Sequence, residues 1–257
     1  MEIIGLPSYL IVFLIGLIVA FLITPVVEKL AVKIGAVDIP TERKVHAEPI
    51  PSLGGVAIYL SFLLALFFAL IKFFPNEREI NGILLGGTVM LLFGIADDIK
   101  DLSPKVKFIG QILAATTLVV FGVQMEFIGN PLGGLIDLGI WGVPATLLWV
   151  VALSNIINFI DGLDGLAAGV SSIAAIALFV SAFETGQTTI AFLTVALAGA
   201  TIGFLTHNFN PARIFMGDSG SMFLGFMLGA ITVHGVMKSV AIVSLLLAKS
   251  KSPRHWM

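Results

Sequence analysis

Two asparagines and two aspartates stand together in residues 154–165, SNIINFIDGLDG, between two apolar runs. Asn155 and Asn158 are three residues apart, as are Asp161 and Asp164, so each pair would project from one face if the segment keeps a helical turn. A glycine follows each aspartate and would let the backbone approach a ligand closely. A solvated acidic turn is the plain alternative, but this regular pairing of Asn with Asp in so apolar a chain favours a binding site.

A second acidic group, DDIKD at residues 97–101, follows another apolar run. The adjacent carboxylates of Asp97 and Asp98 would repel each other at a membrane surface unless cations neutralise them. Magnesium suits such a place because it takes oxygen ligands and bridges carboxylates to phosphates, and manganese is an alternative. An ordinary solvated acidic loop, balanced by Lys100 and Lys105, explains the pattern equally well.

A third polar segment, HNFNPARIFMGDSG at residues 207–220, leads into a further apolar run. Asp218 stands at the start of that run, where helix-terminal amides can hold a phosphate beside a metal. Arg213 would clamp a phosphate, or simply mark the cytoplasmic side of the membrane. Phe215 would stack on a nucleobase, or pack in the core or against lipid.

A fourth polar segment, DIPTERKVHAEPIPSLGG, covers residues 38–55. Arg43, Lys44 and His46 form a basic group that suits an anionic head group. Membrane topology alone also accounts for Lys and Arg at a cytoplasmic helix end, and a lone histidine is more often structural than catalytic.

Composition identifies the class of protein. The 257 residues are 58% hydrophobic and 12% charged, with a mean hydropathy of +1.06, which is outside the range of soluble globular domains. We therefore expect an all-α polytopic membrane protein. The net charge of -2 gives no indication of nucleic-acid binding, and the absence of cysteine leaves only oxygen or imidazole ligands for a metal.

We expect residues 1–257 to form a single integral membrane domain. Membrane spans need about 20 apolar residues, and the sequence offers eight complete spans and, after a turn near Lys238, a partial ninth. All four chemical segments fall on alternate connections and therefore on one side of the membrane, where Lys and Arg are also enriched. The positive-inside rule makes this side cytoplasmic and places the N-terminus outside. Residues 124–139 predict a small external hairpin. The spans cover residues 6–27, 52–74, 80–96, 106–124, 141–158, 166–183, 189–206 and 219–237.

Acids, amides and bases that converge on one face predict transfer of a phosphoryl group at a magnesium site. A membrane prenyltransferase is one alternative, but it would need two DDxxD motifs, and only DDIKD fits. A transporter is another, but transporters place ionisable groups near the bilayer midplane and often repeat their halves. Here the acids lie at the ends of spans.

DDIKD, NIINFIDGLDG and HNFNPARIFMGDSG, in this order and on alternate loops, closely resemble the motifs of the polyprenyl-phosphate N-acetylhexosamine-1-phosphate transferases, glycosyltransferase family 4. The first loop, RKVHAEPIPSLGG, looks more like the branch that transfers N-acetylglucosamine 1-phosphate than the phospho-N-acetylmuramoyl-pentapeptide branch. The resemblance implies a bacterial inner-membrane enzyme in which undecaprenyl phosphate, a membrane lipid, attacks the β-phosphate of a UDP-amino sugar and releases UMP. A homodimer would be in keeping with it.

The same resemblance implies roles for individual residues. Asp97 and Asp98 would be catalytic, beside the lipid phosphate and the metal, and Asp98 and Asp218 would be metal ligands. The remaining candidates would bind substrate: Asn155, Asn158, Asp161 and Asp164 as the nucleotide and diphosphate floor, Asn208 and Phe215 near the uridine, and Arg43, Lys44, His46 and Arg213 at anionic groups.

The end of the chain departs from the family. Members continue past a ninth span into a cytoplasmic loop with a histidine-rich motif, whereas here the apolar run 240–248 gives way to KSKSPRHWM. His255 is no convincing substitute for that motif. We therefore expect a chain that lacks the C-terminal spans and loop of the family.

Overall fold

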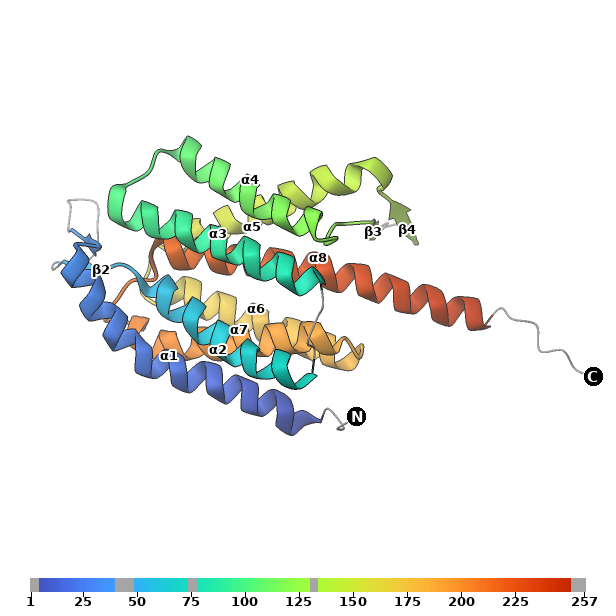
Figure 1. The fold of residues 1–257 in the computed structure, drawn as a ribbon, viewed down its shortest axis with the longest axis horizontal. Helices are drawn as coiled ribbons and strands as arrows, with labels where there is room; N and C mark the ends of the chain where they lie inside the picture. The colour runs from blue at the N-terminus through green and yellow to red at the C-terminus, as the bar shows by residue number, and fades with distance from the viewer. Residues whose placement is uncertain (1–4, 40–48, 74–77, 130–133, 251–257) are drawn as a thin grey trace, which may run out of the picture.

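The computed structural model describes residues 5–39, 49–73, 78–129 and 134–250, with the backbone alone for residues 72, 73 and 236–250. This part of the chain is almost entirely helical (Figure 1), so the prediction of an all-α polytopic protein is confirmed. Six of the helices, namely α1, α2, α3, α6, α7 and α5 with the turn that precedes it, are long and apolar enough to cross a membrane. The helices are α1 (Leu6–Ile34), α2 (Gly54–Phe73), α3 (Arg78–Lys100), α4 (Pro104–Val120), α5 (Gly142–Ile160), α6 (Leu166–Glu184), α7 (Thr188–Asn208) and α8 (Gly217–Ser250).

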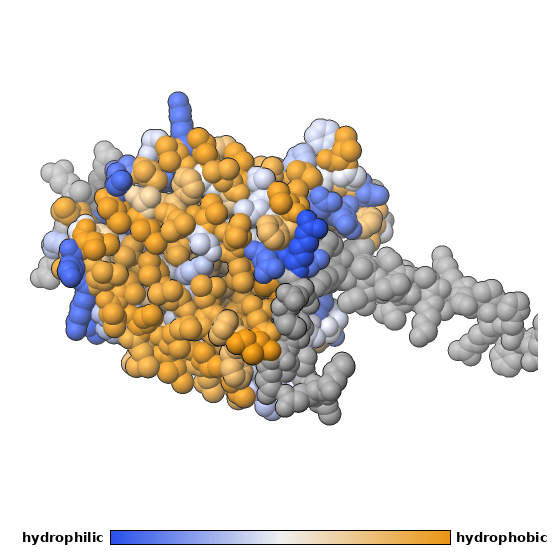
Figure 2. Space-filling model, viewed as in Figure 1, coloured by the Kyte–Doolittle hydropathy of each residue, from blue (hydrophilic) through white to orange (hydrophobic). Residues whose placement is uncertain are grey.

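Two helices form the centres of two adjoining groups. Helix α7 packs against α1, α2 and α6, and it is buried along most of its length. Helix α8 packs against α3 and α5, and α2 and α6 join the two groups by contacting α8 as well. The face of the bundle in Figure 2 is largely hydrophobic, with hydrophilic residues gathered toward its ends, as a protein surrounded by lipid requires.

The connections alternate between the two ends of the bundle. Helices α1, α3, α5 and α7 end at the same end of the bundle at which α2, α4, α6 and α8 begin, and α2, α4 and α6 end at the opposite end (Figure 1). The described parts of the four predicted chemical segments therefore do come to one end, which we call the polar end. The predicted hairpin is also confirmed, as β3 (Phe127–Gly129) paired antiparallel with β4 (Leu135–Asp137), followed by the 3₁₀ turn η1 (Gly139–Trp141).

The predicted turn near Lys238 is wrong, because α8 runs without a break from Gly217 to Ser250. The predicted eighth span and partial ninth span are thus one helix. Residues 236–240 hold a lysine and a serine but no proline, and a single lysine is a good helix former that does not interrupt the backbone hydrogen bonds.

Glycines allow the start of α8 to sit deep among its neighbours. A Cβ on Gly55 of α2 would overlap the backbone of Gly220, and one on Gly94 of α3 would overlap that of Ser219. These close approaches bring the end of α3 and the start of α8 together. A short ladder completes the arrangement: β1 (Val37–Asp38) pairs with β2 (Ile50–Pro51), and Ser52 bridges to Phe215.

Candidate active site

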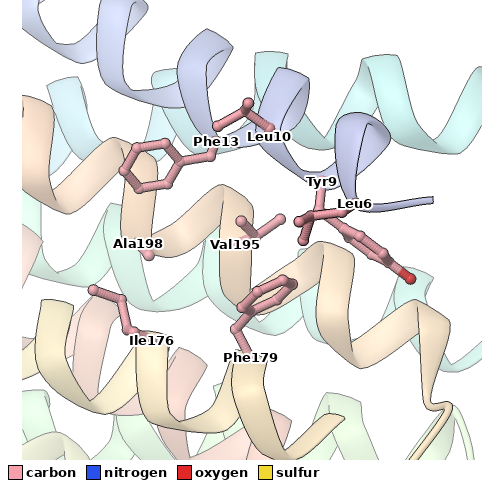
Figure 3. A pocket seen from close by; sticks show the side chains of 8 residues that line it. All are labelled: Leu6, Tyr9, Leu10, Phe13, Ile176, Phe179, Val195 and Ala198. Carbon is pink, nitrogen blue, oxygen red and sulfur yellow. The ribbon is translucent and has the colours of Figure 1, made fainter. Parts of the chain in front are cut away.

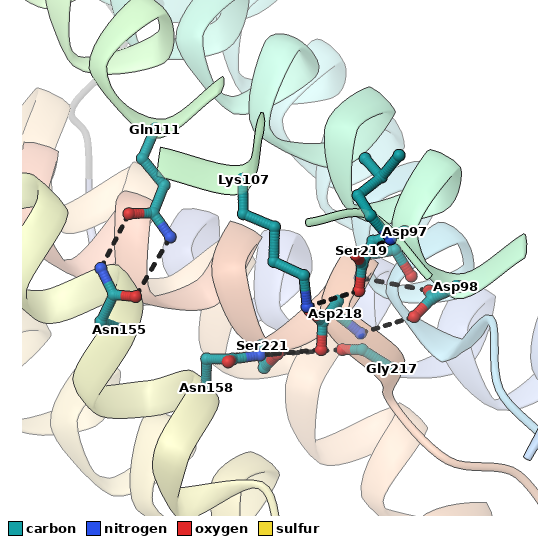
Figure 4. A network of polar contacts seen from close by, with 11 residues as sticks. Asp97, Asp98, Lys107, Gln111, Asn155, Asn158, Gly217, Asp218, Ser219 and Ser221 are labelled. Atoms are coloured by element: carbon teal, nitrogen blue, oxygen red, sulfur yellow. Dashed lines mark hydrogen bonds and ion pairs between the residues drawn. The ribbon is translucent and has the colours of Figure 1, made fainter. Parts of the chain in front are cut away.

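Three carboxylates from distant parts of the sequence meet at the polar end (Figure 4). Asp97 and Asp98 come from the last turn of α3, and Asp218 from the first turn of α8. Asp97 is buried and Asp218 is half-buried. The structure therefore brings together the DDIKD and GDSG motifs, 120 residues apart, as the sequence predicted.

A lysine lies between two of these carboxylates. The Nζ of Lys107 is 2.7 Å from Oδ2 of Asp97 and 2.5 Å from Oδ2 of Asp218. Lys107 comes from the start of α4 and is half-buried. From the sequence it is only one of the Lys and Arg residues enriched on the predicted cytoplasmic side. A lysine near a helix start has that meaning by default, and its position beside the acids gives it a second role.

Asp98 binds the beginning of α8. Its Oδ1 accepts the backbone N–H of Asp218 at 2.7 Å, and its Oδ2 accepts that of Ser219 at 3.2 Å. The carboxylate thus satisfies two of the amide groups that a helix N-terminus leaves unpaired, and its charge complements the helix dipole. These amides were expected to hold a phosphate, whereas here they hold Asp98.

The two asparagines share one face of α5, as their spacing predicted. Asn158 donates from Nδ2 to Oδ1 of Asp218 at 2.9 Å and to Oγ of Ser221 at 2.8 Å. Asn155 exchanges amide hydrogen bonds with Gln111 of α4, at 2.7 and 3.3 Å. Asn158 therefore belongs to the carboxylate cluster, while Asn155 ties α5 to α4 one turn away.

The two aspartates of the same segment separate, because α5 ends at Ile160 and no helical turn joins them. Asp161 is half-buried, and its carboxylate makes no hydrogen bond to any described residue. Burial, together with the negative charge of Asp218, raises the pKa of Asp161 to about 7. This carboxyl group therefore lies near the charge of Asp218 and would gain from a cation.

Asp164 instead holds the connection between α7 and α8. Its Oδ2 accepts hydrogen bonds from Nδ2 of Asn210 and from the backbone N–H of Ala212, both at 3.0 Å. Asn208 acts on the same connection, since its Nδ2 donates to the carbonyl of Ile214 at 2.9 Å. Both residues shape this loop in the structure.

Two other candidates in this loop, Phe215 and Arg213, contact other parts of the polar end. Phe215 is half-buried, and its backbone joins the first loop by accepting from Gly54 and donating to Pro51. Arg213 is 63% exposed and forms an ion pair with Glu28 of α1 at 3.5 Å. Arg43, Lys44 and His46 lie outside the described residues.

The donor set suits a hard divalent cation. Carboxylate and amide oxygens are the ligands that magnesium prefers, and a cation, the ammonium of Lys107, already bridges Asp97 and Asp218. As arranged, the described residues hold no group of three acidic, histidine or cysteine side chains at metal-binding distances. A metal would therefore bind through one or two of these carboxylates and complete its shell with water or phosphate oxygens.

An apolar pocket of about 300 Å³ lies toward the opposite end of the bundle. Figure 3 shows its lining by the beginning of α1 and by side chains from α6 and α7, including Tyr9, Phe13 and Phe179. It offers no carboxylate, amide or base, so the polar end is the candidate active site.

Similar proteins carry names that agree with this chemistry. The chain is 40% identical to a probable undecaprenyl-phosphate N-acetylglucosaminyl 1-phosphate transferase of Bacillus subtilis, over 91% of this chain and 65% of the relative. It is 38% identical to a decaprenyl-phosphate N-acetylglucosaminephosphotransferase of Mycolicibacterium smegmatis, over 84% and 58%. A phospho-N-acetylmuramoyl-pentapeptide-transferase of Geobacillus thermodenitrificans is 32% identical, over 93% and 79%.

The chain thus spans a little under two thirds of the length of the first two relatives. A family model described as glycosyl transferase family 4 matches residues 80–236. This range contains the carboxylates of α3 and α8, Lys107 and the asparagines of α5. With most of the chain and the whole described carboxylate cluster inside the match, the chain belongs to glycosyl transferase family 4.

Proposed function

We propose that this chain transfers N-acetylglucosamine 1-phosphate from a UDP-sugar to undecaprenyl phosphate and releases UMP, in the first membrane step of cell-envelope glycan synthesis. The meeting of Asp97, Asp98 and Asp218, with Lys107 between Asp97 and Asp218, carries the proposal. The site combines acids for a cation with an ammonium for phosphate, at the end of a lipid-embedded bundle. The names of the Bacillus and Mycolicibacterium relatives favour N-acetylglucosamine as the sugar.

The reaction exchanges one phosphoanhydride bond for another. An oxygen of the lipid phosphate forms a bond to the β-phosphorus of the UDP-sugar, and the bond from that phosphorus to the bridging oxygen breaks, so that UMP leaves with this oxygen. A phosphate monoester has a second pKa near 6, so the nucleophile is already largely ionised at neutral pH. Asp97 then needs only to orient the lipid phosphate or take its last proton.

The other residues of the site would position the metal and the substrates and balance their charge. Asp218 is the side chain best placed to hold magnesium, with Asp97 or Asp161 as its second carboxylate, and Asp98 fixes the start of α8 and hence Asp218. When bound, magnesium would offset the charge that develops on the diphosphate. Asn158 holds Asp218 from the side, and Asp164 with Asn208 shapes the loop expected to meet the nucleotide.

The test is UMP release by the purified protein in detergent with undecaprenyl phosphate, UDP-N-acetylglucosamine and magnesium. We expect formation of UMP that needs both the lipid and the metal, and a loss of at least about 100-fold in Asp218→Asn, because an electrostatic contact to the reacting groups is removed. Glu184→Gln is the matched control: it removes an exposed acid at the opposite end of the bundle and should leave turnover unchanged.

Two outcomes would contradict the proposal. UMP formation without lipid phosphate would indicate hydrolysis of the donor rather than transfer. Faster turnover with UDP-N-acetylmuramoyl-pentapeptide than with UDP-N-acetylglucosamine would favour the other branch, which the Geobacillus relative represents.

A further inference from the structure

We propose that Lys107 and the divalent cation compete for one position between Asp97 and Asp218, so that metal binding releases the lysine. This inference rests on the proposed function, because it concerns the metal of that reaction. Lys107 contacts the Oδ2 atoms of both aspartates, at 2.7 and 2.5 Å. Magnesium binds oxygens at about 2.0–2.1 Å, and two cations cannot share these atoms without strong repulsion.

The two carboxylates are held in place independently of Lys107. The Oδ1 of Asp97 accepts the backbone N–H of Leu102 at 2.8 Å, and the Oδ1 of Asp218 accepts Nδ2 of Asn158 at 2.9 Å. Each carboxylate is therefore fixed through one oxygen and offers the other to a cation. The pair stays pre-arranged when the ammonium leaves.

Lys107 is also able to leave without any movement of the helices. Its charge sits at the end of a flexible four-carbon side chain, and its side chain is 27% exposed. A displaced ammonium beside the metal would meet the phosphate oxygens of a substrate, for which lysine is a good point-charge partner. Metal binding and the presentation of a phosphate-binding charge would thus be one event.

Binding of manganese, followed through the electron paramagnetic resonance signal of the free ion, tests the competition without any need for turnover. We expect Lys107→Met to bind Mn²⁺ about tenfold or more tightly than the unchanged protein, because the competing charge at contact distance is gone. Lys107→Arg keeps that charge and should not bind Mn²⁺ more tightly than the unchanged protein.

Lys105→Met is the matched control. Lys105 is exposed and lies two residues earlier in α4, so its loss changes the net charge equally but acts only through screened, longer-range electrostatics. We expect less than about a twofold change in affinity. An affinity of Lys107→Met no higher than that of Lys105→Met would overturn the competition.

Asp218→Asn separates this inference from the proposed function. If the unchanged protein shows saturable Mn²⁺ binding that Asp218→Asn abolishes, while Lys107→Met has no effect, the metal site stands and the competition fails. If no variant binds Mn²⁺ saturably, the proposed metal chemistry fails together with the competition.

A second measurement uses the unchanged protein and so does not depend on the folding of a variant. An amine-reactive acetylating reagent, read out by mass spectrometry, should modify Lys107 several-fold faster when Mn²⁺ is added, because its nitrogen is no longer held by two carboxylates. The rate at Lys105 should stay constant. Equal or slower modification of Lys107 with metal would contradict the release.

Discussion

At the scale of single residues, the two hydrogen bonds of Asp98 predict that its replacement lowers the stability of the fold. Asp98→Asn keeps the shape of the side chain but leaves one acceptor oxygen for two backbone N–H groups. We expect a loss of about 1–2 kcal/mol in the free energy of unfolding, read as a lower thermal transition in detergent. Activity should fall as well, because Asp218 lies in the first turn of α8 and moves with it. An unchanged transition would show that α8 does not depend on this carboxylate.

The raised pKa of Asp161 predicts that the stability of the fold depends on pH. Its pKa rises from 3.8 to about 7 in the folded protein, so between these values the folded state keeps a proton that the unfolded chain has released. The resulting destabilisation grows as pH rises from about 4 and is complete above about pH 7. Asp218 is the charged group that faces it.

Asp161→Asn removes this cost. In metal-free buffer it should be more stable than the unchanged protein by about 1 kcal/mol at pH 8, a figure discounted for partial exposure, and equally stable near pH 4. Thermal unfolding at the two pH values measures the difference. A gain of the same size at both pH values would argue against titration of Asp161 as its cause.

At the scale of elements, the depth of α8 depends on glycines in its neighbours. Gly94→Val would place a side chain against the backbone of Ser219 and force α3 away from α8. We expect a loss of about 2–3 kcal/mol or more in stability, together with a loss of activity because Asp97 and Asp218 separate. Gly169→Ala in α6 is the control, because a Cβ there meets nothing within 4 Å. It should be neutral or gain up to about 1 kcal/mol.

Local patterns in the sequence predicted the elements well and the contacts between them less well. The spacing of Asn155 and Asn158 places them on one helix face because both precede the end of α5 at Ile160. The same argument fails for Asp161 and Asp164, since the helix ends before them. The capping of α8 by Asp98 was not predictable, because local capping rules look at the residues just before a helix, whereas Asp98 lies 120 residues away.

The role of Lys107 was missed for a related reason. Its charge was read as a marker of the cytoplasmic side, which any lysine beside a span can be. Gln111 stands four residues later on the same helix and contacts Asn155, so the two share a face of α4. A polar pair at helical spacing beside an apolar run was the available signal. The alternation of connections placed the ends of α3 and α8 on one face, and the resemblance implied that Asp98 and Asp218 share a metal, but no pattern within one helix reports its partner.

At the scale of the whole molecule, the alternation of connections predicts how the chain lies in the membrane. The chain contains no cysteine, so single cysteines report accessibility without background. Lys105→Cys places a thiol at the polar end, and Glu184→Cys places one at the opposite end; both positions are exposed. A membrane-impermeant thiol reagent added to intact cells should label Glu184→Cys, and should reach Lys105→Cys only after the cells are opened. The reverse pattern would show that the polar end faces outward.

The unbroken course of α8 has a consequence for the surrounding bilayer. Its 34 residues extend about 51 Å, against a hydrocarbon thickness of about 30 Å. Tilting usually absorbs such hydrophobic mismatch, but the Asp98 bonds and the close backbone contacts with α2 and α3 fix the first turn of α8. In membranes of different thickness, the second half of α8 must therefore bend or tilt while its first turn stays in place. The geometry of the carboxylates should then be insensitive to the acyl-chain length of the lipids around them.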